Sequence, residues 1–146
     1  MANALAGIIN WKKAELLDSI LGSGTPANVY ITLSTTTPNP DGTGITEPTA
    51  EEYEPVQVAN DSENWEDATD ANPSIKENKN AIQFPKAQED WGEMQGWAIK
   101  AQETGTDPAH IIVAGHFVGD NPTIAKHVAY QFEAGELEVH FNTPVA

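Results

Sequence analysis

The chain has 146 residues and no cysteine, so it is long enough for one domain with its own core and excludes disulfides and thiolate metal sites. Its 22 acidic residues outnumber seven basic ones, all of them lysines, and the net charge is −15. Because this surface would repel a phosphate backbone or an anionic membrane, we expect neither nucleic acid nor a membrane as a partner. The opening residues do not resemble a secretory signal, and no stretch approaches the length of a membrane span.

An amphipathic helix or arm is predicted within residues 1–24. Apolar residues recur there at three- and four-residue spacing, from Leu5 to Leu21, and this spacing forms one stripe along a helix. We expect the firm part of the helix to begin near Asn10 as its N-cap and to end before Gly22. Such a helix can pack on its own domain or on a neighbouring subunit, and the sequence favours neither arrangement.

The apolar period changes to two from residue 28 onward. Residues 28–34 alternate apolar and polar side chains, which predicts a half-buried strand. Residues 35–55 are rich in threonine, proline and glycine, and this composition indicates a long loop. Alternation returns at residues 53–59, where Pro55 is typical of an edge strand or of a strand start.

The second half of the chain predicts further short strands. Residues 60–79 are polar and acidic, and they form either a second long connection or a poorly patterned strand around Trp65. Strands are then predicted at residues 81–84, 94–101, 109–118, 123–132 and 136–142. Gly96 indicates a bulge or a close approach of another segment. Seven or eight strands without intervening helices predict a mainly β fold, an antiparallel, jelly-roll-like β-sandwich over residues 25–146.

No catalytic or metal-binding pattern is recognisable in the sequence. His110 and His116 share a predicted strand but lie too far apart along it to bind one ion, and no His-x-His or His-Glu-x-x-His motif exists. The acidic cluster at residues 63–70 lacks the spacing of a calcium loop and is best interpreted as solvated loop charge. No serine lies in a Gly-x-Ser-x-Gly turn. We therefore predict a protein that is not an enzyme and needs no cofactor.

The helix and the tryptophans supply the candidates for protein contact. Four tryptophans could form a platform for sugars, as in carbohydrate-binding modules, although packing is the commoner use. Trp65 is the one large apolar residue of a polar segment, which is typical of an intersubunit or ligand contact. The predicted contact residues are Leu5, Ile9, Trp11, Leu16, Ile20, Tyr53 and Trp65.

A series of motifs resembles a known family. After the short N-terminal helix come Val29-Tyr-Ile-Thr-Leu-Ser-Thr-Thr-Thr-Pro38, Asp41-Gly-Thr-Gly44, Ala81-Ile-Gln-Phe-Pro85, Trp91-Gly92 and Phe132-x-Ala-Gly135-x-Leu137. This series resembles the small virion proteins of tailed bacteriophages that are labelled tail fibre or minor tail proteins. Some related small β proteins decorate or cement capsids. The resemblance implies a structural role and brings no catalytic residues with it.

The function implied by this resemblance is that of a bacteriophage virion structural protein, made in the host cytoplasm. Because the chain is too short for a shaft and a receptor-binding head, we predict a capsid cement or decoration protein, with a small tail-fibre or minor tail component as the alternative. We expect a homo-oligomer, most simply a trimer, that contacts the major capsid protein or other virion proteins. The helix and the loops 35–52 and 60–79 would make these contacts. A carbohydrate-binding module is the rival from another class.

Overall fold

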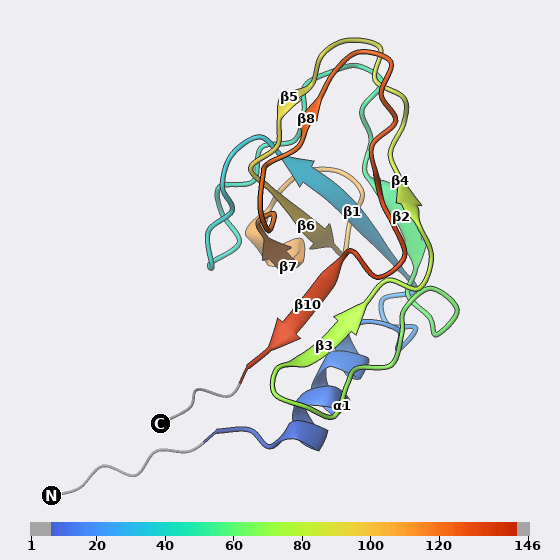
Figure 1. The fold of residues 1–146 in the computed structure, drawn as a ribbon, viewed down its shortest axis with the longest axis vertical. Helices are drawn as coiled ribbons and strands as arrows, with labels where there is room; N and C mark the ends of the chain where they lie inside the picture. The colour runs from blue at the N-terminus through green and yellow to red at the C-terminus, as the bar shows by residue number, and fades with distance from the viewer. Residues whose placement is uncertain (1–6, 143–146) are drawn as a thin grey trace, which may run out of the picture.

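The computed structural model describes residues 7–142, which form a mainly β, antiparallel fold with one N-terminal α-helix, as predicted (Figure 1). Helix α1 spans Asn10–Ile20, and the short 3-10 helix η1 spans Pro108–His110. The strands of the described residues are β1 (Asn28–Ser34), β2 (Val56–Ala59), β3 (Ser74–Glu77), β4 (Ile82–Gln83), β5 (Gly92–Glu93), β6 (Gly96–Lys100), β7 (Ile111–Gly115), β8 (Thr123–Ile124), β9 (Gln131–Phe132) and β10 (Glu138–Phe141).

Four strands form the main sheet, in the order β2-β1-β6-β7, with every neighbouring pair antiparallel. Ile31 lies opposite Ile99 across β1 and β6, and Trp97 lies opposite Gly115 across β6 and β7. The other described strands pair as the two-stranded ribbons β10-β3, β4-β9 and β5-β8. Figure 1 shows the β5-β8 ribbon toward the top of the molecule and the β10-β3 ribbon toward the bottom, beside α1.

The core lies between one face of the main sheet and the β4-β9 ribbon. Val29, Ile31 and Leu33 are fully buried on that face, because alternate residues of a strand share a side. Phe84 and Phe132 belong to the same buried cluster and approach from the second layer, with their ring centroids 6.3 Å apart. Two antiparallel layers around one core confirm the predicted sandwich class.

Two glycines allow segments to pack closely at the end of the sheet. A side chain at Gly96 would overlap the ring of Pro38 and would lie 2.6 Å from the carbonyl oxygen of Gly115. A side chain at Gly115 would lie 2.8 Å from the indole ring of Trp97. The close approach predicted at Gly96 is therefore confirmed, and Gly115 is required for a similar reason.

The helix begins and ends where the sequence predicts, but its N-cap residue differs. Gly22 has a φ of 87° directly after the C-cap residue Leu21, a conformation that glycine adopts without strain. Asn10 is the first helical residue, and the N-cap is Ile9, which makes no side-chain capping bond. Asn10 as the N-cap was therefore a wrong prediction, by one residue.

The strands are shorter and more numerous than the sequence predicts. The predicted strand at 123–132 divides into β8 and β9 around a turn in which His127 has a φ of 75°. Residues 60–79 end in β3, and Trp65 forms an isolated bridge with Asn78. Ten strands replace the expected seven or eight. A strand of two residues contains no alternation that a sequence pattern could reveal.

Candidate interaction surfaces

The inner face of α1 buries a lysine together with apolar residues. Ala14 and Leu17 are buried on the side of the helix that packs against β3. Lys13 is buried beside them, and its Nζ donates a hydrogen bond to Oδ1 of Asn72 at 2.7 Å. A buried ammonium requires such partners, so this bond fixes the helix relative to the chain around Asn72.

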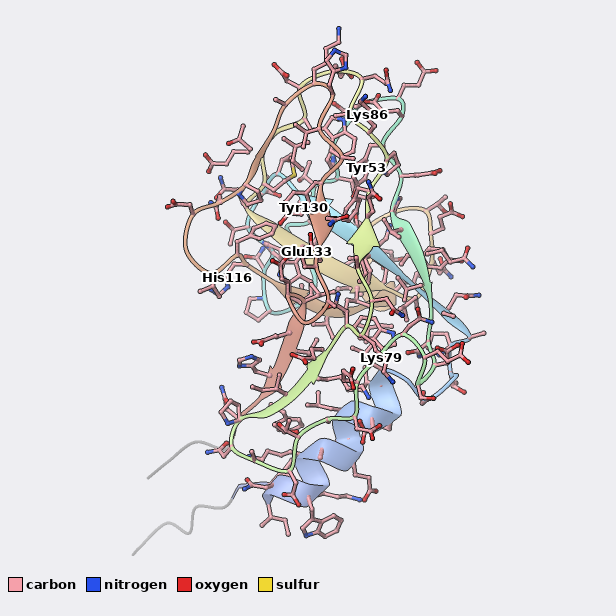
Figure 2. The ribbon with its side chains drawn as sticks, turned by 45° about the vertical axis from the view of Figure 1, so that its right-hand side comes forward. Tyr53, Lys79, Lys86, His116, Tyr130 and Glu133 are labelled. Atoms are coloured by element: carbon pink, nitrogen blue, oxygen red, sulfur yellow. The ribbon has the colours of Figure 1, made fainter. Side chains whose placement is uncertain are left out.

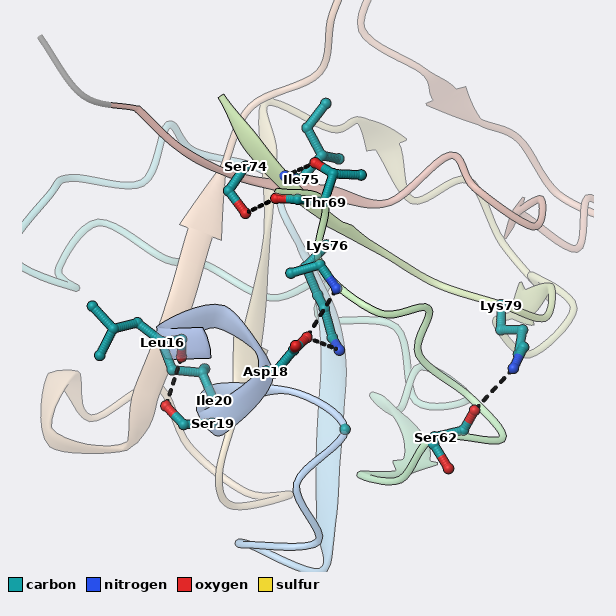
Figure 3. A network of polar contacts seen from close by, with 12 residues as sticks. Leu16, Asp18, Ser19, Ile20, Ser62, Thr69, Ser74, Ile75, Lys76 and Lys79 are labelled. Atoms are coloured by element: carbon teal, nitrogen blue, oxygen red, sulfur yellow. Dashed lines mark hydrogen bonds and ion pairs between the residues drawn. The ribbon is translucent and has the colours of Figure 1, made fainter. Parts of the chain in front are cut away.

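A second buried lysine reaches α1 from β3. The Nζ of Lys76 lies 2.8 Å from Oδ1 of Asp18, and the same oxygen accepts the backbone N–H of Ala68 at 2.9 Å. Figure 3 shows the Asp18 carboxylate on α1 meeting the Lys76 ammonium on β3. Hydrogen bonds to charged groups are stronger than neutral ones, so two polar contacts supplement the apolar packing of the helix.

Helix α1 and its N-cap residue expose large apolar side chains on two opposite flanks. Ile9 is 58% exposed, Trp11 is 55% exposed and Ile20 is 36% exposed. Ile9, Leu16 and Ile20 are spaced by seven and four residues, which places them along one flank of a helix, and Leu16 is half-buried. The helix therefore buries a lysine and exposes an isoleucine and a tryptophan. Exposed apolar groups of this kind mark interaction surfaces.

The loop of residues 35–53 covers the other face of the main sheet. Lys100 of β6 is buried, and its Nζ donates to Oε2 of Glu47 at 3.1 Å and to the carbonyl oxygens of Glu103 and Gly105 at 2.8 and 2.9 Å. Glu47 thus attaches the loop to the sheet through an ion pair that is nearly closed to water. Its carboxylate also accepts a short hydrogen bond from Oγ1 of Thr32.

Tyr53 attaches the end of the same loop. Its hydroxyl oxygen accepts the backbone N–H of Leu33 at 2.8 Å and lies 2.7 Å from Oγ1 of Thr32. Its ring makes an edge contact with Trp91, at a centroid separation of 5.1 Å. Burial raises the pKa of the Tyr53 hydroxyl well above its usual range, although the bonds from Leu33 and Thr32 oppose that shift. The loop is therefore part of the packed domain.

The predicted contact residues occupy very different positions. Ile9 at the N-cap and Ile20 are exposed on one flank of α1, with Leu16 half-buried between them. Trp11 is exposed on the opposite flank, and Leu5 lies outside the described residues. Tyr53 is half-buried and points its hydroxyl into the sheet.

Trp65 is only 1% exposed and belongs to the core cluster, which corrects the expectation that it faces a partner. Its bridge to Asn78 at the end of β3 carries the ring inward. The polar residues on either side of it gave no sign of this, because the bridge joins residues distant in sequence.

An open groove that the sequence did not predict lies between β7 and β10. Its volume is about 570 Å³, and it is lined by residues 113–118 and 138–140 and by Trp97, Tyr130, Phe132 and Glu136. The rings of Phe117 and Phe132 stack there with centroids 6.2 Å apart. Val118 is 98% exposed at its rim. Figure 2 shows Tyr130 and Glu133 near the centre of the molecule and His116 on the loop after β7.

Within residues 7–142, no group of three or more histidine, aspartate or glutamate side chains is arranged to hold a metal ion. The same residues include no helix with the length and hydropathy to cross a bilayer. The exposed apolar side chains of α1 and the groove between β7 and β10 are therefore the candidate interaction surfaces of the described residues.

Comparison with known proteins identifies the family. The family described as podophage GP4 fiber I protein gp80 has a model that matches residues 7–140, which is nearly the whole described fold. This chain belongs to that family. No curated protein and no solved structure matches the chain.

Membership of the fiber I family makes the chain a structural protein of the phage virion, and this confirms the resemblance seen in the sequence motifs. The family description names a fibre, and it thus favours the tail-fibre alternative over the capsid cement predicted from chain length. Chain length does not exclude a fibre role, because the shaft and the head of a fibre can come from different chains.

Proposed function

We propose that this fiber I protein is a small structural component of the phage tail fibre and that its copies associate through α1. The match of the fiber family to residues 7–140 supports this proposal more than any other observation, because it includes α1, strands β1 to β9 and most of β10. A fibre can be built from several short chains, so 146 residues are sufficient for one segment of it.

The outer side of α1 supports self-association. Ile9 and Ile20 expose apolar surface to water, and an apolar partner surface would cover it. Each Å² of apolar surface buried in this way stabilises the association by roughly 25 cal/mol. Three helices that pack along this flank would bring the Ile9, Leu16 and Ile20 side chains together around an axis. The trimer expected from the sequence is therefore compatible with the position of α1, and it is part of the proposal.

Acidity limits how two copies can meet. With a net charge of −15, broad contact between two bodies brings like charges within a Debye length of about 10 Å. An apolar flank of a helix avoids most of this repulsion. Three of the seven lysines are buried, namely Lys13, Lys76 and Lys100, and this leaves few cations at the surface. Figure 2 shows two of the exposed ones, Lys79 near α1 and Lys86 at the far end of the molecule.

Light scattering after size exclusion tests the oligomer. We expect the native chain to elute at three times its 15.7 kDa mass, and the variants Ile9→Ser and Ile20→Ser to shift toward the monomer while keeping the native circular-dichroism spectrum. Val128→Ser is the matched control, since Val128 is exposed to a similar degree far from α1 in the chain. A native chain that stays monomeric at high concentration would refute self-association. Loss of the oligomer in Val128→Ser would show that the interface is not confined to α1.

Electron microscopy with a gold-labelled antibody against the native chain tests the location. Label on the fibres of intact particles supports the proposal, whereas label over the capsid surface returns the chain to decoration. The two measurements are separable, because a trimer on the capsid would leave the oligomer result intact and would overturn only the location.

A further inference from the structure

The groove between β7 and β10 is bounded by the edges of two strands. Residues 113–115 at the end of β7 and residues 116–118 directly after it line one side, and residues 138–140 of β10 line the other. Side chains of a strand alternate between its faces, so consecutive residues line a groove together when the backbone edge itself faces the opening. Among the described strands, β7 pairs only with β6 and β10 only with β3. Both edges are therefore open toward the same space.

The edge of β7 lacks the features that normally prevent pairing. Its sequence, Ile-Ile-Val-Ala-Gly from Ile111 to Gly115, contains neither a charged residue nor a proline. The opposite edge strand, β2, directly follows Pro55, and β10 carries Glu138 and His140. Natural sheets block their edges with charge, proline or a covering segment, because an uncharged edge accepts another strand through its backbone groups.

The side chains of the groove indicate what kind of strand fits. Phe117, Phe132 and Val139 make its floor apolar, and the rings of Phe117 and Tyr130 meet edge to face with centroids 6.4 Å apart. Glu136 and Glu138 add negative charge. Glu136 and Tyr130 line the same groove. Burial raises the pKa of the Tyr130 hydroxyl, and the Glu136 carboxylate raises it further.

We propose that the edge of β7 binds an extended segment of another virion protein, in which apolar side chains alternate with lysine or arginine. Backbone hydrogen bonds to β7 would supply much of the affinity, the apolar side chains would cover Phe117 and Phe132, and the cations would neutralise Glu136 and Glu138. A second copy of this chain fits less well, because each copy brings a charge of −15 to a groove that is already acidic. This binding site does not depend on whether the chains associate through α1.

Capped synthetic peptides test the proposal on the full-length protein. A seven-residue peptide that alternates lysine and valine should bind and should slow backbone amide exchange in residues 111–115. The same peptide with glutamate in place of lysine tests the charge, and a version with a central proline tests the backbone pairing. Both should bind at least tenfold more weakly. Equal binding of the glutamate peptide, or slowed exchange outside β7 and β10, would overturn the proposal.

A further peptide and three variants locate the contact. A peptide of residues 1–11, which has no charged side chain, represents a second copy, and tighter binding of it than of the lysine peptide would also overturn the proposal.

Glu136→Gln and Glu138→Gln should each weaken the binding of the lysine peptide roughly two- to fivefold, the range of an exposed ion pair. Glu89→Gln, an exposed carboxylate outside the groove, is the matched control and should leave binding unchanged. Unchanged binding in both groove variants would count against the assigned site.

Discussion

The loop of residues 35–53 and helix α1 are attached to the β body by similar contacts, yet they turn different surfaces outward. Each carries a carboxylate, Glu47 or Asp18, that meets a buried lysine of a strand. The loop points its aromatic Tyr53 inward, whereas α1 leaves Trp11 in water. The length of a segment without secondary structure therefore does not show whether it is free to bind a partner. The direction of its large apolar side chains does.

Removal of the Tyr53 side chain should have the largest effect on this comparison. Tyr53→Ala deletes a ring packed against Phe84 and Trp91, and we expect the free energy of unfolding to fall by about 3–5 kcal/mol. Urea denaturation measures this change. Trp11→Ala is the matched change on α1 and should alter the same quantity by less than about 0.5 kcal/mol. Equal losses in the two variants would abolish the distinction between the loop and the helix.

Loss of the Asp18 carboxylate should come second. Asp18→Ala leaves the Lys76 ammonium buried without its anionic partner, and we expect a loss of about 2–3 kcal/mol, below that of a fully enclosed pair because Asp18 is partly exposed. The control is Glu15→Ala, which removes the exposed pair with Lys12 and should cost less than about 0.5 kcal/mol. A double variant, Asp18→Ala with Lys76→Met, should recover much of the loss. No recovery would mean that the pair itself is not what holds α1.

Alkaline pH should reveal the burial of Tyr53. Because burial raises the pKa of this hydroxyl, the folded state retains the proton after the unfolded chain has lost it near pH 10. The free energy of unfolding should therefore fall as pH rises above about 10, by about 1 kcal/mol at pH 11 from this group alone. Tyr53→Phe should show a shallower decline, measured by urea denaturation at several pH values. Parallel declines in the two proteins would contradict the burial of the hydroxyl.

Acid should produce the smallest effect, through Glu52 at the end of the loop. The backbone N–H of Gln88 and then the indole N–H of Trp91 hold the pKa of this carboxyl below its usual 4.5. The stabilisation is complete above pH 4.5 and is lost as the pH falls through the lower, folded pKa. Melting temperatures of Glu52→Gln should thus vary slightly less between pH 5 and 3 than those of the native chain. Its exposed neighbour serves as the control, with Glu51→Gln expected to retain the native slope.

The sequence predicts elements that depend on local pattern and misses those decided by distant partners. The strand at 28–34 and the end of α1 at Gly22 follow from alternation and from glycine chemistry, and both are confirmed. The burial of Lys13 was not predicted, because it depends on Asn72, far along the chain. The groove likewise depends on how β7 lies relative to β10, and no local pattern specifies that relation.

The position of β1 at the centre of the main sheet has a consequence for how the chain folds. β1 pairs on one side with β2, which follows it in sequence. On its other side it pairs with β6, where Tyr30 lies opposite Lys100, so this pairing cannot form until the chain has been made as far as Lys100. The β10-β3 ribbon beside α1 joins segments that are about as far apart in sequence. Such distant pairings slow folding to roughly milliseconds or seconds. During synthesis at a ribosome, β1 and β2 would leave the exit tunnel long before β6, and an unpaired edge of β1 would stay exposed until most of the chain had been made.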